Sequence, residues 1–419
     1  MTPLALALAL LLEAAPAAAV AAPSTPAPPL AIMGARVELG DGTGLANASV
    51  IVVDGKIAEV GVGLSPPRGA QVIDGRGKVL TPGLIATGSQ VGLVEVGLER
   101  GTVDASLEGA AVPAFRAIDG FNPRSWRVAI DRGQGVTSSV LTPWGALIHG
   151  QGFVVELSGE PDSPAHAKRV AMFGALAGGA RDAAGGSRGG VLLRLREILD
   201  DVRFYRANKS AYDRAQTRPL ALSRLHLEAM FDVVDGKLPF VIDANRESDL
   251  RALLALADEQ RLRVVVNGGA EAWLVAKELA ARKVPVILQP TTMEPWGFDA
   301  LHARDDAAAL LDEAGVPLIL SSGGTDNGTT RLRQEAGVAV AYGLPWRKAL
   351  TAITLAPSRA FGVDGELGTI AKGKRADLVL WSGDPFEVSS AADVVIIGGR
   401  RQDMGSRQRA LAERYRAAH

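Results

Sequence analysis

The sequence contains no cysteine among its 419 residues. This absence excludes a disulfide framework, a thiolate metal site and the attachment of a lipid through sulfur. An excess of one charge is also absent, because 45 basic residues are balanced by 46 acidic ones. The chain therefore has no overall field that would attract nucleic acid or an anionic membrane, and we predict no nucleic-acid partner.

Long apolar runs are scarce as well. Residues 4–12 form an apolar run of nine residues, whereas a helix that crosses a bilayer needs about 20, so we predict no integral membrane contact. Small residues follow this run and end in Ala19-Val20-Ala21, which is typical of a cleavage site for export. We interpret residues 1–21 as a signal peptide and 22–31 as an Ala/Pro-rich linker, and expect a periplasmic or extracellular protein. An unstructured arm is the alternative interpretation.

What the sequence does contain is a regular alternation of strand and helix patterns. Over residues 81–356, strand patterns such as GVTSSVLTP, LPFVIDA, RLRVVVN, VPVILQP and VPLILSS alternate with helical patterns such as SDLRALLALADEQ. Repeated strand-helix units indicate parallel strands joined by right-handed crossovers, and enough of them close into a barrel. We therefore predict an α/β fold with a (β/α)8 TIM-like barrel.

Shorter strand patterns flank the barrel. In residues 32–80, SVIVVDGKIAEVG predicts a hairpin whose turn is Asp54-Gly55. Strand patterns return near the other end in ADLVLWSG and DVVIIGGR. Two β segments separated by a barrel most simply pair with each other, so residues 32–80 plus 357–402 are predicted to form a small composite β-sandwich. Residues 403–419 are expected to be a basic C-terminal helix or tail, and the glycine-rich residues 173–190 a mobile loop.

Two blocks of sequence about 270 residues apart carry a resemblance to a known family. VIDGRGKVLTPGLI and ALTAITLAPSRAFGVDGELGTIAKGKRADLVLWSGDPFE resemble the passages in which amidohydrolases enter and leave their barrel. The chain thus resembles the amidohydrolase superfamily, in particular its imidazolonepropionase-like and prolidase-like exported members. The resemblance implies hydrolysis of non-peptide C–N bonds with zinc or another divalent metal. It also implies ligands at the barrel mouth: His-x-His after strand one, Lys or Glu after strand four, His after strands five and six, and Asp after strand eight.

The histidine positions of that ligand set hold other residues. The His-x-His positions fall on Gly88 and Gln90, the strand-five histidine on Asp243, and the strand-six region on Asn267. Glycine offers no side-chain ligand, and an amide oxygen is a neutral ligand suited to hard cations instead of zinc. We therefore predict no metal or other cofactor.

The remaining ligand positions are less regular. The strand-eight aspartate is either replaced by Gly323 or displaced to Asp326, and the lysine position falls on Glu156. Asp243, Asp326 and Glu156 would suit Ca²⁺, Mg²⁺ or Mn²⁺ if they converged. The alternative is that each pairs with a base such as Arg246 or Arg331, or caps a helix.

One histidine is a further candidate. His149 follows a strand in PWGALIHGQG, where a loop at the barrel mouth is expected, so it is a candidate acid, base or ligand, or else a hydrogen-bonding loop residue. The candidate catalytic residues are therefore Asp243, Asp326, Glu156 and His149. The candidate pocket is formed by the positions of the missing ligands, namely Gly88, Gln90, Asp243, Asn267, Gly323 and Asp326.

Three functions are compatible with this inventory. The first is a metal-depleted pseudo-hydrolase that acts as a binding or scaffold module, with a small-molecule ligand at the barrel mouth, because loops and not the ion shape that pocket. The second is an active hydrolase with an atypical, carboxylate-based site. The third is an inactive partner subunit of a homologous, active amidohydrolase.

Overall fold

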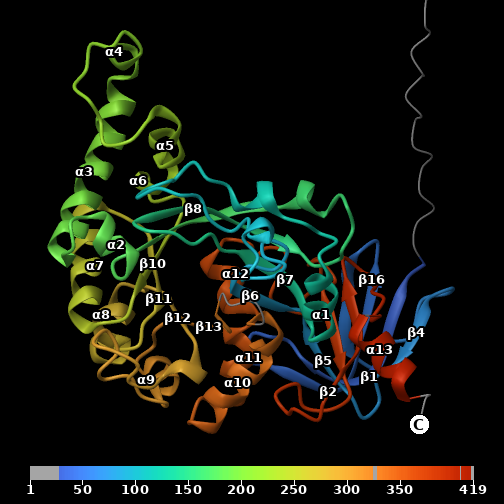
Figure 1. Cartoon of the computed structure of the whole chain (residues 1–419). Helices are drawn as coiled ribbons and strands as arrows, with labels where there is room; N and C mark the ends of the chain where they lie inside the picture. Colours follow the sequence, from blue (N-terminus) through green and yellow to red (C-terminus); the bar gives the residue numbers. More distant parts are fainter. Residues whose placement is uncertain (1–27, 324–327, 406, 417–419) are drawn as a thin grey trace, which may run out of the picture.

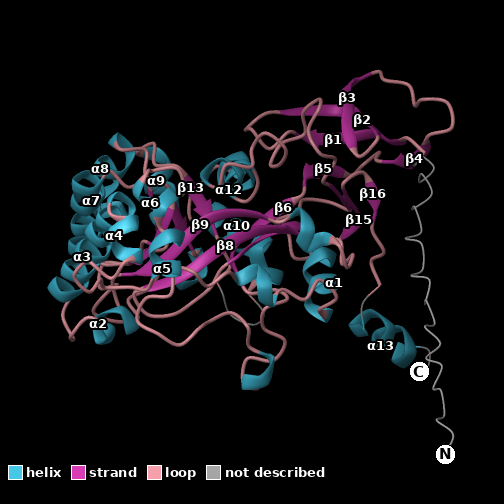
Figure 2. Ribbon diagram, turned by 90° about the horizontal axis from the view of Figure 1, so that it is seen from above, coloured by secondary structure: helices cyan, strands magenta, loops and turns pink. Residues whose placement is uncertain are grey.

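The computed structural model describes residues 28–323, 328–405 and 407–416. Two eight-stranded sheets organise the chain, one in a near-closed barrel and one in a smaller domain beside it (Figures 1 and 2). The predicted α/β fold, a TIM-like barrel with an additional sheet domain, is therefore confirmed. The predicted signal peptide of residues 1–21 lies outside the described residues.

The sheet domain combines strands from both ends of the chain. Figure 1 shows the blue N-terminal strands beside the red C-terminal ones. The strands follow the order β16-β15-β14-β5-β1-β2-β3, and β4 pairs with β1, so they form one continuous sheet. Their bounds are β1 (Leu30–Glu38), β2 (Gly44–Val53), β3 (Lys56–Val62), β4 (Gln71–Asp74), β5 (Val79–Pro82), β14 (Leu378–Trp381), β15 (Ala392–Ile397) and β16 (Arg400–Arg401).

The β2–β3 hairpin has the predicted two-residue turn. Val53 pairs with Lys56, and the two residues between them, Asp54 and Gly55, have φ values of 49° and 77°. Positive φ at both central positions is the geometry of a type I′ turn, for which Asp-Gly is a favoured sequence. Inward-facing side chains such as Ile32, Val50 and Leu380 then form one apolar cluster with residues from both ends of the chain.

The barrel strands follow the order β13-β12-β11-β10-β9-β8-β7-β6. No ladder joins β13 to β6 among the described residues, but the hydroxyl of Ser321 donates to the carbonyl oxygen of Thr87 at 2.7 Å across this gap. The bounds are β6 (Leu84–Ser89), β7 (Val136–Leu141), β8 (Ile148–Glu156), β9 (Lys168–Ala175), β10 (Phe240–Ala244), β11 (Val264–Gly268), β12 (Val286–Leu288) and β13 (Leu318–Leu320).

Strand β8 runs opposite to its neighbours, which differs from the all-parallel barrel that the sequence predicts. It pairs antiparallel with both β7 and β9. The β7–β8 connection spans only residues 142–147. A crossover between parallel strands needs a dozen or more residues, so this connection can only return the chain as a hairpin.

Helices surround the remaining strands. Figure 1 shows α7, α8 and α9 beside β10–β13, and the long helix α3 at the outer edge of the molecule. The bounds are α1 (Trp126–Gly133), α2 (Gly179–Ala183), α3 (Arg188–Ala207), α4 (Lys209–Asp213), α5 (Arg224–Ala229), α6 (Phe231–Val234), α7 (Glu247–Gln260), α8 (Ala276–Ala281), α9 (Ala307–Glu313), α10 (Leu332–Ala341), α11 (Trp346–Ala352), α12 (Leu355–Ala360) and α13 (Arg407–Arg416). Short 3-10 helices lie at η1 (Arg100–Thr102), η2 (Ala117–Gly120), η3 (Ser163–His166), η4 (Ala272–Val275), η5 (Pro290–Thr292) and η6 (Thr329–Arg331).

The glycine-rich segment 173–190 is more ordered than predicted. Its first residues belong to β9, Gly179–Ala183 form α2, and Ser187 caps α3 by accepting a hydrogen bond from the backbone N–H of Gly190. The prediction of a mobile loop was wrong because strand pairing and a helix cap satisfy the backbone here despite its glycines.

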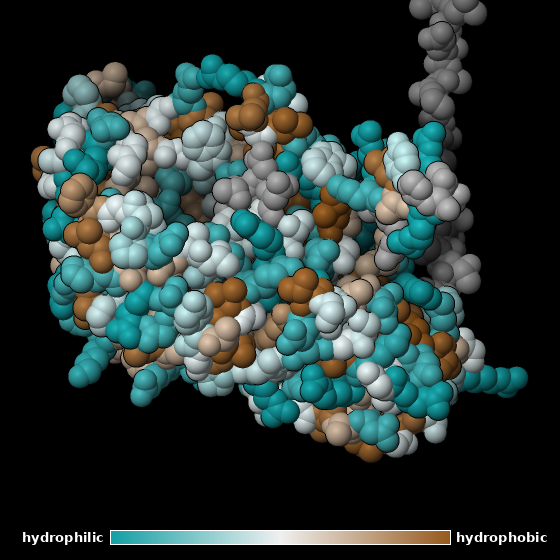
Figure 3. Space-filling model, turned by 60° about the horizontal axis from the view of Figure 1, so that its bottom comes forward, coloured by the Kyte–Doolittle hydropathy of each residue, from teal (hydrophilic) through white to brown (hydrophobic). Residues whose placement is uncertain are grey.

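Apolar and polar side chains are interspersed over the face drawn in Figure 3. In the part of the chain that the structure describes, no helix combines the length and apolar character needed to cross a bilayer.

Candidate ligand-binding site at the barrel mouth

The interior of the barrel is built in layers. Every barrel strand contributes to one apolar cluster, which contains Ile85, Val140, Val154, Phe173, Val241, Val265, Ile287 and Ile319. Side chains of a strand alternate between its two faces. For the strands that point toward the mouth, the next inward position is therefore two residues later. This second layer consists of Thr87, Thr142, Ala175, Asp243, Asn267, Gln289 and Ser321.

The second layer is polar, yet it holds only one carboxylate. Asp243 and Asn267 are aligned on the neighbouring strands β10 and β11, and Asn267 Nδ2 donates a hydrogen bond to Asp243 Oδ1 at 2.6 Å. Gln289 and Ser321 directly follow β12 and β13. The expectation that Asp243 and Asn267 lie together at the mouth therefore agrees with the geometry.

His149 reaches the same end of the barrel because β8 is reversed. It is the second residue of β8, and the register of the β8–β9 pairing shifts between Ile148 and Gly150. Such a bulge re-aims the side chain at the irregular position. The His149 ring is buried, and its Nε2 lies 3.0 Å from the carbonyl oxygen of Ala146.

Asp243 and His149 form an electrostatically linked pair. Burial raises the pKa of Asp243 and lowers the pKa of His149, while the attraction between their charged forms opposes both shifts. Part of the Asp243 surface still reaches solvent, although protein atoms surround its carboxyl group on most sides. Burial therefore favours the uncharged form of each residue.

The position that the resemblance assigns to the first histidine, Gly88, differs from a histidine site in its backbone conformation as well as in its missing side chain. Gly88 has a φ of 68°, a conformation that residues with a side chain rarely adopt. A Cβ atom at this position would lie 3.1 Å from Ser321 Oγ. Ser321 donates a hydrogen bond to the carbonyl of Thr87, so a side chain at position 88 would crowd this serine and would hold a strained backbone conformation.

Glycines with positive φ and close neighbours also lie at two other strand ends. Gly268 has a φ of 95°, and a Cβ atom there would lie 2.4 Å from Asn245 Oδ1. Gly323 has a φ of 72°, and its Cβ would lie 2.5 Å from Gln289 Oε1. The side-chain amides of Asn245 and Gln289 therefore occupy the space that larger residues at these glycines would need.

The residues that are present do not fit a binuclear metal centre. In the described ranges, no group of three or more His, Cys, Asp or Glu side chains is arranged so that it could hold a metal ion. Gln90 is half-buried after β6, and its backbone carbonyl accepts hydrogen bonds from Leu93 and Val94. The carboxylate of Glu335 is fully buried. It accepts hydrogen bonds from the backbone N–H and the hydroxyl of Thr291.

The prediction that Glu156 belongs to the mouth was wrong. Glu156 is the last residue of β8, and because β8 is reversed, this end of the strand lies at the base of the barrel, opposite Ser138 near the start of β7. There its carboxylate lies 3.3 Å from Arg375 Nη1, and Arg375 also pairs with Asp377. Glu156 therefore joins the barrel to the sheet domain.

Other candidates are placed as follows. Asp326 lies outside the described residues. His226 accepts a hydrogen bond from the backbone N–H of Ala114, and His302 lies 3.1 Å from a carboxylate oxygen of Glu271, so neither joins the Asp243–His149 pair.

A cavity of about 530 Å³ lies beside this layer. Its lining includes Asn245, Asn267, Gln289, Ser321 and Gly323 as polar or small residues, and Leu288, Met293 and Trp296 as an apolar wall. This size and mixture are typical of a small-molecule site. Asn245, Gln289 and Ser321 were not among the sequence candidates. Asn245 directly follows the strand pattern LPFVIDA, and Gln289 and Ser321 lie near the ends of VPVILQP and VPLILSS, which is the signal that could have found them.

Comparison with known proteins agrees with the fold. The model of the amidohydrolase family matches residues 301–401. Amidohydrolase tasK from Hapsidospora irregularis is 25% identical over 367 residues, which cover 80% of this chain. The chain spans only 37% of the length of that relative.

Solved structures extend the likeness to almost the whole chain. An amidohydrolase from Thermotoga maritima MSB8 is 26% identical, with a TM-score of 0.81 over 89% of this chain and 99% of that one. A prolidase complexed with N-methylphosphonate-L-proline is 18% identical, with a TM-score of 0.56 over 89% of this chain and 99% of its own, and shares the fold alone. From the barrel, the added sheet domain and these matches, we conclude that the chain belongs to the amidohydrolase superfamily.

Proposed function

We propose that the chain binds a small neutral molecule with amide or hydroxyl groups at the barrel mouth, and that it has lost the metal-dependent hydrolysis of its superfamily. One observation carries this proposal. The inward layer at the strand ends contains a single carboxylate, Asp243, among hydroxyl and amide side chains. Such a layer offers hydrogen bonds to a ligand, but with His149 as the one imidazole described beside it, it lacks the set of imidazoles that holds zinc and makes a zinc-bound water reactive.

The chemistry of the cavity supports a neutral ligand. The described lining holds one charged residue, the exposed Glu294, and no lysine, arginine or histidine, so an anionic ligand would find no counter-charge there. The amides of Asn245 and Gln289 both donate and accept hydrogen bonds, and Trp296 and Met293 offer apolar contact. A few placed polar groups beside an apolar wall are what fixes the orientation of a small ligand.

An unsatisfied hydroxyl lies next to the cavity, on Thr87, which contacts the lining residue Ser321 but is not itself among the lining residues. Thr87 is 1% exposed, and its Oγ1 has no hydrogen-bond partner in the described chain. A buried hydroxyl without a partner costs free energy, and Thr87 lies in the inward layer beside Ser321. We expect a bound ligand to supply the missing hydrogen bond.

A thermal-shift screen of the full chain tests the proposal. The probes are N-acetyl amino acids, dipeptides and cyclic amides, with metal content measured on protein purified without added ions. We expect at least one probe to raise Tm without being hydrolysed, because a ligand that binds only the folded state stabilises it. Stoichiometric zinc together with chelator-sensitive turnover would overturn the proposal.

Two nearly isosteric variants sharpen this experiment. Thr87→Val removes the unpaired hydroxyl at the mouth and should reduce the ligand-induced shift. Thr137→Val is the matched control, since Thr137 is also 1% exposed with an unpaired hydroxyl but lies near the start of β7, at the barrel base. An equal loss in both variants would show that the hydroxyl at the mouth does not contact the ligand.

A second candidate function rests on the Asp243–His149 pair. In this version, His149 takes a proton from water as the water oxygen attacks the amide carbon, and protonated Asp243 gives its proton to the leaving nitrogen. Transfer of the proton from His149 to Asp243 then restores the pair, so one water molecule is added across the C–N bond. Turnover that resists chelators and is lost in both Asp243→Asn and His149→Phe would support this function over simple binding.

Location and partners belong to the same proposal. We infer that the protein is exported and that a homologous, catalytically complete amidohydrolase is a candidate partner subunit. Mass spectrometry of the protein purified from its native host should find a chain that begins at Ala22. Native co-purification tests the partner, and its repeated absence would remove that part of the proposal.

A further inference from the structure

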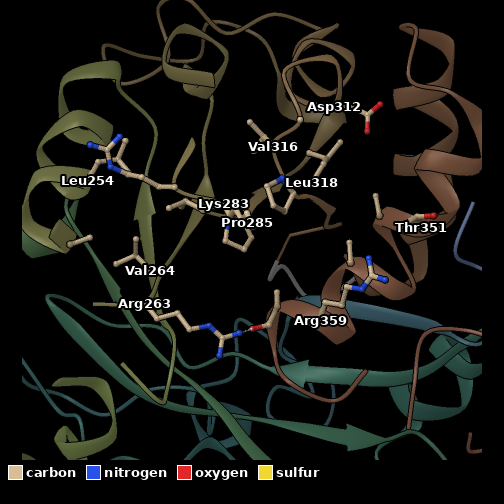
Figure 4. A pocket seen from close by; sticks show the side chains of 18 of the residues that line it. Leu254, Arg263, Val264, Lys283, Pro285, Asp312, Val316, Leu318, Thr351 and Arg359 are labelled. Carbon is tan, nitrogen blue, oxygen red and sulfur yellow. Dashed lines mark hydrogen bonds between the residues drawn. The ribbon is translucent and has the colours of Figure 1, made fainter. Parts of the chain in front are cut away.

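A second cavity, of about 760 Å³, lies at the base of the barrel, opposite the mouth (Figure 4). Val264 begins β11, Pro285 directly precedes β12, and Val316 lies two residues before β13, and all three line this space. Since parallel strands begin at the base and end at the mouth, the basal cavity is separate from the site around Asp243.

The wall of the basal cavity is aliphatic. Leu254 and Ala257 come from α7, Ala352 from α11 and Ala356 from α12, and no aromatic residue is present among the described lining residues. Figure 4 shows Val264, Pro285, Val316 and Leu318 around the open space. Such a wall suits a flexible hydrocarbon chain better than a flat ring, which would gain most from stacking on an aromatic face.

The charged lining residues have an excess of positive charge. Arg282 pairs with Asp258 at 2.9 Å, and Lys348 pairs with Asp312 at 3.1 Å. The three remaining cations, Arg263, Lys283 and Arg359, are exposed and form no ion pair in the described part of the chain.

Two of these cations interact with the protein without forming an ion pair. Arg263 donates from Nη2 to the carbonyl oxygen of Ala360 at 2.7 Å. Arg359 acts on Asp41 only through space, as one of the smaller effects on a carboxyl whose pKa is lowered. The excess is local, because the whole chain has a net charge of −1.

We propose that the basal cavity binds an anionic amphiphile, with an unbranched aliphatic chain against the apolar wall and a carboxylate attracted by the positive charge that Arg263, Lys283 and Arg359 give to the lining. The aliphatic wall favours a ligand with a hydrocarbon chain, and the cations without an ion pair favour a ligand with an acid group. This inference is independent of the function proposed for the mouth.

Calorimetric titration of the full chain with decanoate tests the proposal, with decanol and butyrate as partial probes. We expect saturable binding of one decanoate per chain, at least tenfold weaker binding of either partial probe, and weakening at high salt because exposed charges are screened. No binding of decanoate, or equal binding of decanol, would overturn the proposal.

Charge variants identify the site. Lys283→Ala/Arg359→Ala changes only exposed side chains and should weaken decanoate binding at least tenfold. Lys372→Ala/Arg68→Ala removes the same charge at exposed positions outside the cavity and should leave binding unchanged. Equal effects of the two double variants would mean nonspecific attraction and would contradict the proposal.

Filling the cavity gives an independent check. Ala356→Leu places a larger side chain in the half-buried lining and should abolish binding while Tm is retained. If this variant does not fold, the charge variants still decide. Asp243→Asn at the mouth should leave decanoate binding intact, and a loss in that variant would contradict the separation of the two sites.

Discussion

Asn267 Nδ2 and Asp243 Oδ1 lie 2.6 Å apart at the ends of neighbouring strands, at the positions for which the resemblance to amidohydrolases implies metal-binding histidines. An amide that donates to a carboxyl group holds that group in place without needing an ion. This hydrogen bond joins two neighbouring strands within the inward layer of the mouth.

The first prediction concerns Asp243→Asn. Burial raises the folded-state pKa of Asp243, so its contribution to stability is fully present below the unfolded pKa of about 3.9 and is lost as pH rises toward the folded pKa. Asparagine does not titrate, so the variant does not lose this stability as pH rises. The Tm of the variant minus that of the wild type should therefore increase from pH 5 to pH 8. Scanning calorimetry at several pH values measures this difference.

Asp364→Asn is the control for that series. Asp364 is exposed, so its replacement shows how much of the Tm difference comes from removing one acidic residue away from the barrel interior. A difference for Asp243→Asn that stays constant between pH 5 and pH 8 would show that the carboxyl group titrates as it does in the unfolded chain.

The second prediction concerns Asp131 in α1, which is 4% exposed. Burial raises its pKa to about 7, against a smaller opposing effect of Arg127. The folded state thus keeps a proton that the unfolded state has released above about pH 4, and stability falls as pH rises from about 4 to about 7.

Asp131→Asn should remove this pH dependence and stabilise the protein at pH 8. The upper limit is on the order of 4 kcal/mol, from the difference of about three pKa units at ~1.4 kcal/mol each. Urea unfolding at pH 5 and pH 8 measures it. A variant that is destabilised equally at both pH values would instead indicate that Asp131 is charged in the folded state.

The third prediction concerns the metal positions. Gly88→His/Gln90→His should not bind zinc stoichiometrically, because Gly88 has a φ of 68° and its Cβ would approach Ser321. Elemental analysis after dialysis against zinc measures binding. One zinc per chain with retained Tm would show that the missing imidazoles alone prevent metal binding. Gln90→His alone is the matched control, since it leaves the strained position unchanged.

The fourth prediction concerns the link between barrel and sheet domain. Arg375→Met leaves Asp377, whose side chain is 6% exposed, without its counter-charge, and should destabilise the protein by roughly 3–5 kcal/mol. Glu156→Gln should cost only about 1 kcal/mol, because Arg375 keeps its pairing with Asp377. Urea unfolding measures the free energy of unfolding of both variants. An equal or larger decrease for Glu156→Gln would show that the Arg375–Asp377 pair does not contribute more than the Arg375–Glu156 pair.

Much of the fold was predictable because it follows from periodicity and turn chemistry. Asp54 and Gly55 predicted a hairpin, and both adopt the positive φ values that the turn requires. The barrel strands β10 to β13 coincide with patterns in which an apolar run is followed by a polar residue. These features are local, so the sequence contains the information needed to find them.

The reversal of β8 was predictable in principle but was missed. Its signal is the short connection of residues 142–147, which cannot contain a crossover helix. The error moved Glu156 to the wrong end of the barrel. The close approach of Gly88 to Ser321 was not predictable from local sequence. It joins the first and last strands of the barrel and depends on how the barrel closes.

The reversed strand also bears on the order of folding. Strands β7, β8 and β9 follow one another in the chain and pair directly as an antiparallel meander, whereas β9 and β10 pair only after the long connection of residues 176–239 is closed. Hairpins form within microseconds, and contacts between distant residues form more slowly because closing a long loop costs entropy. The meander is therefore expected to act as an early nucleus on which the later strands of the barrel assemble.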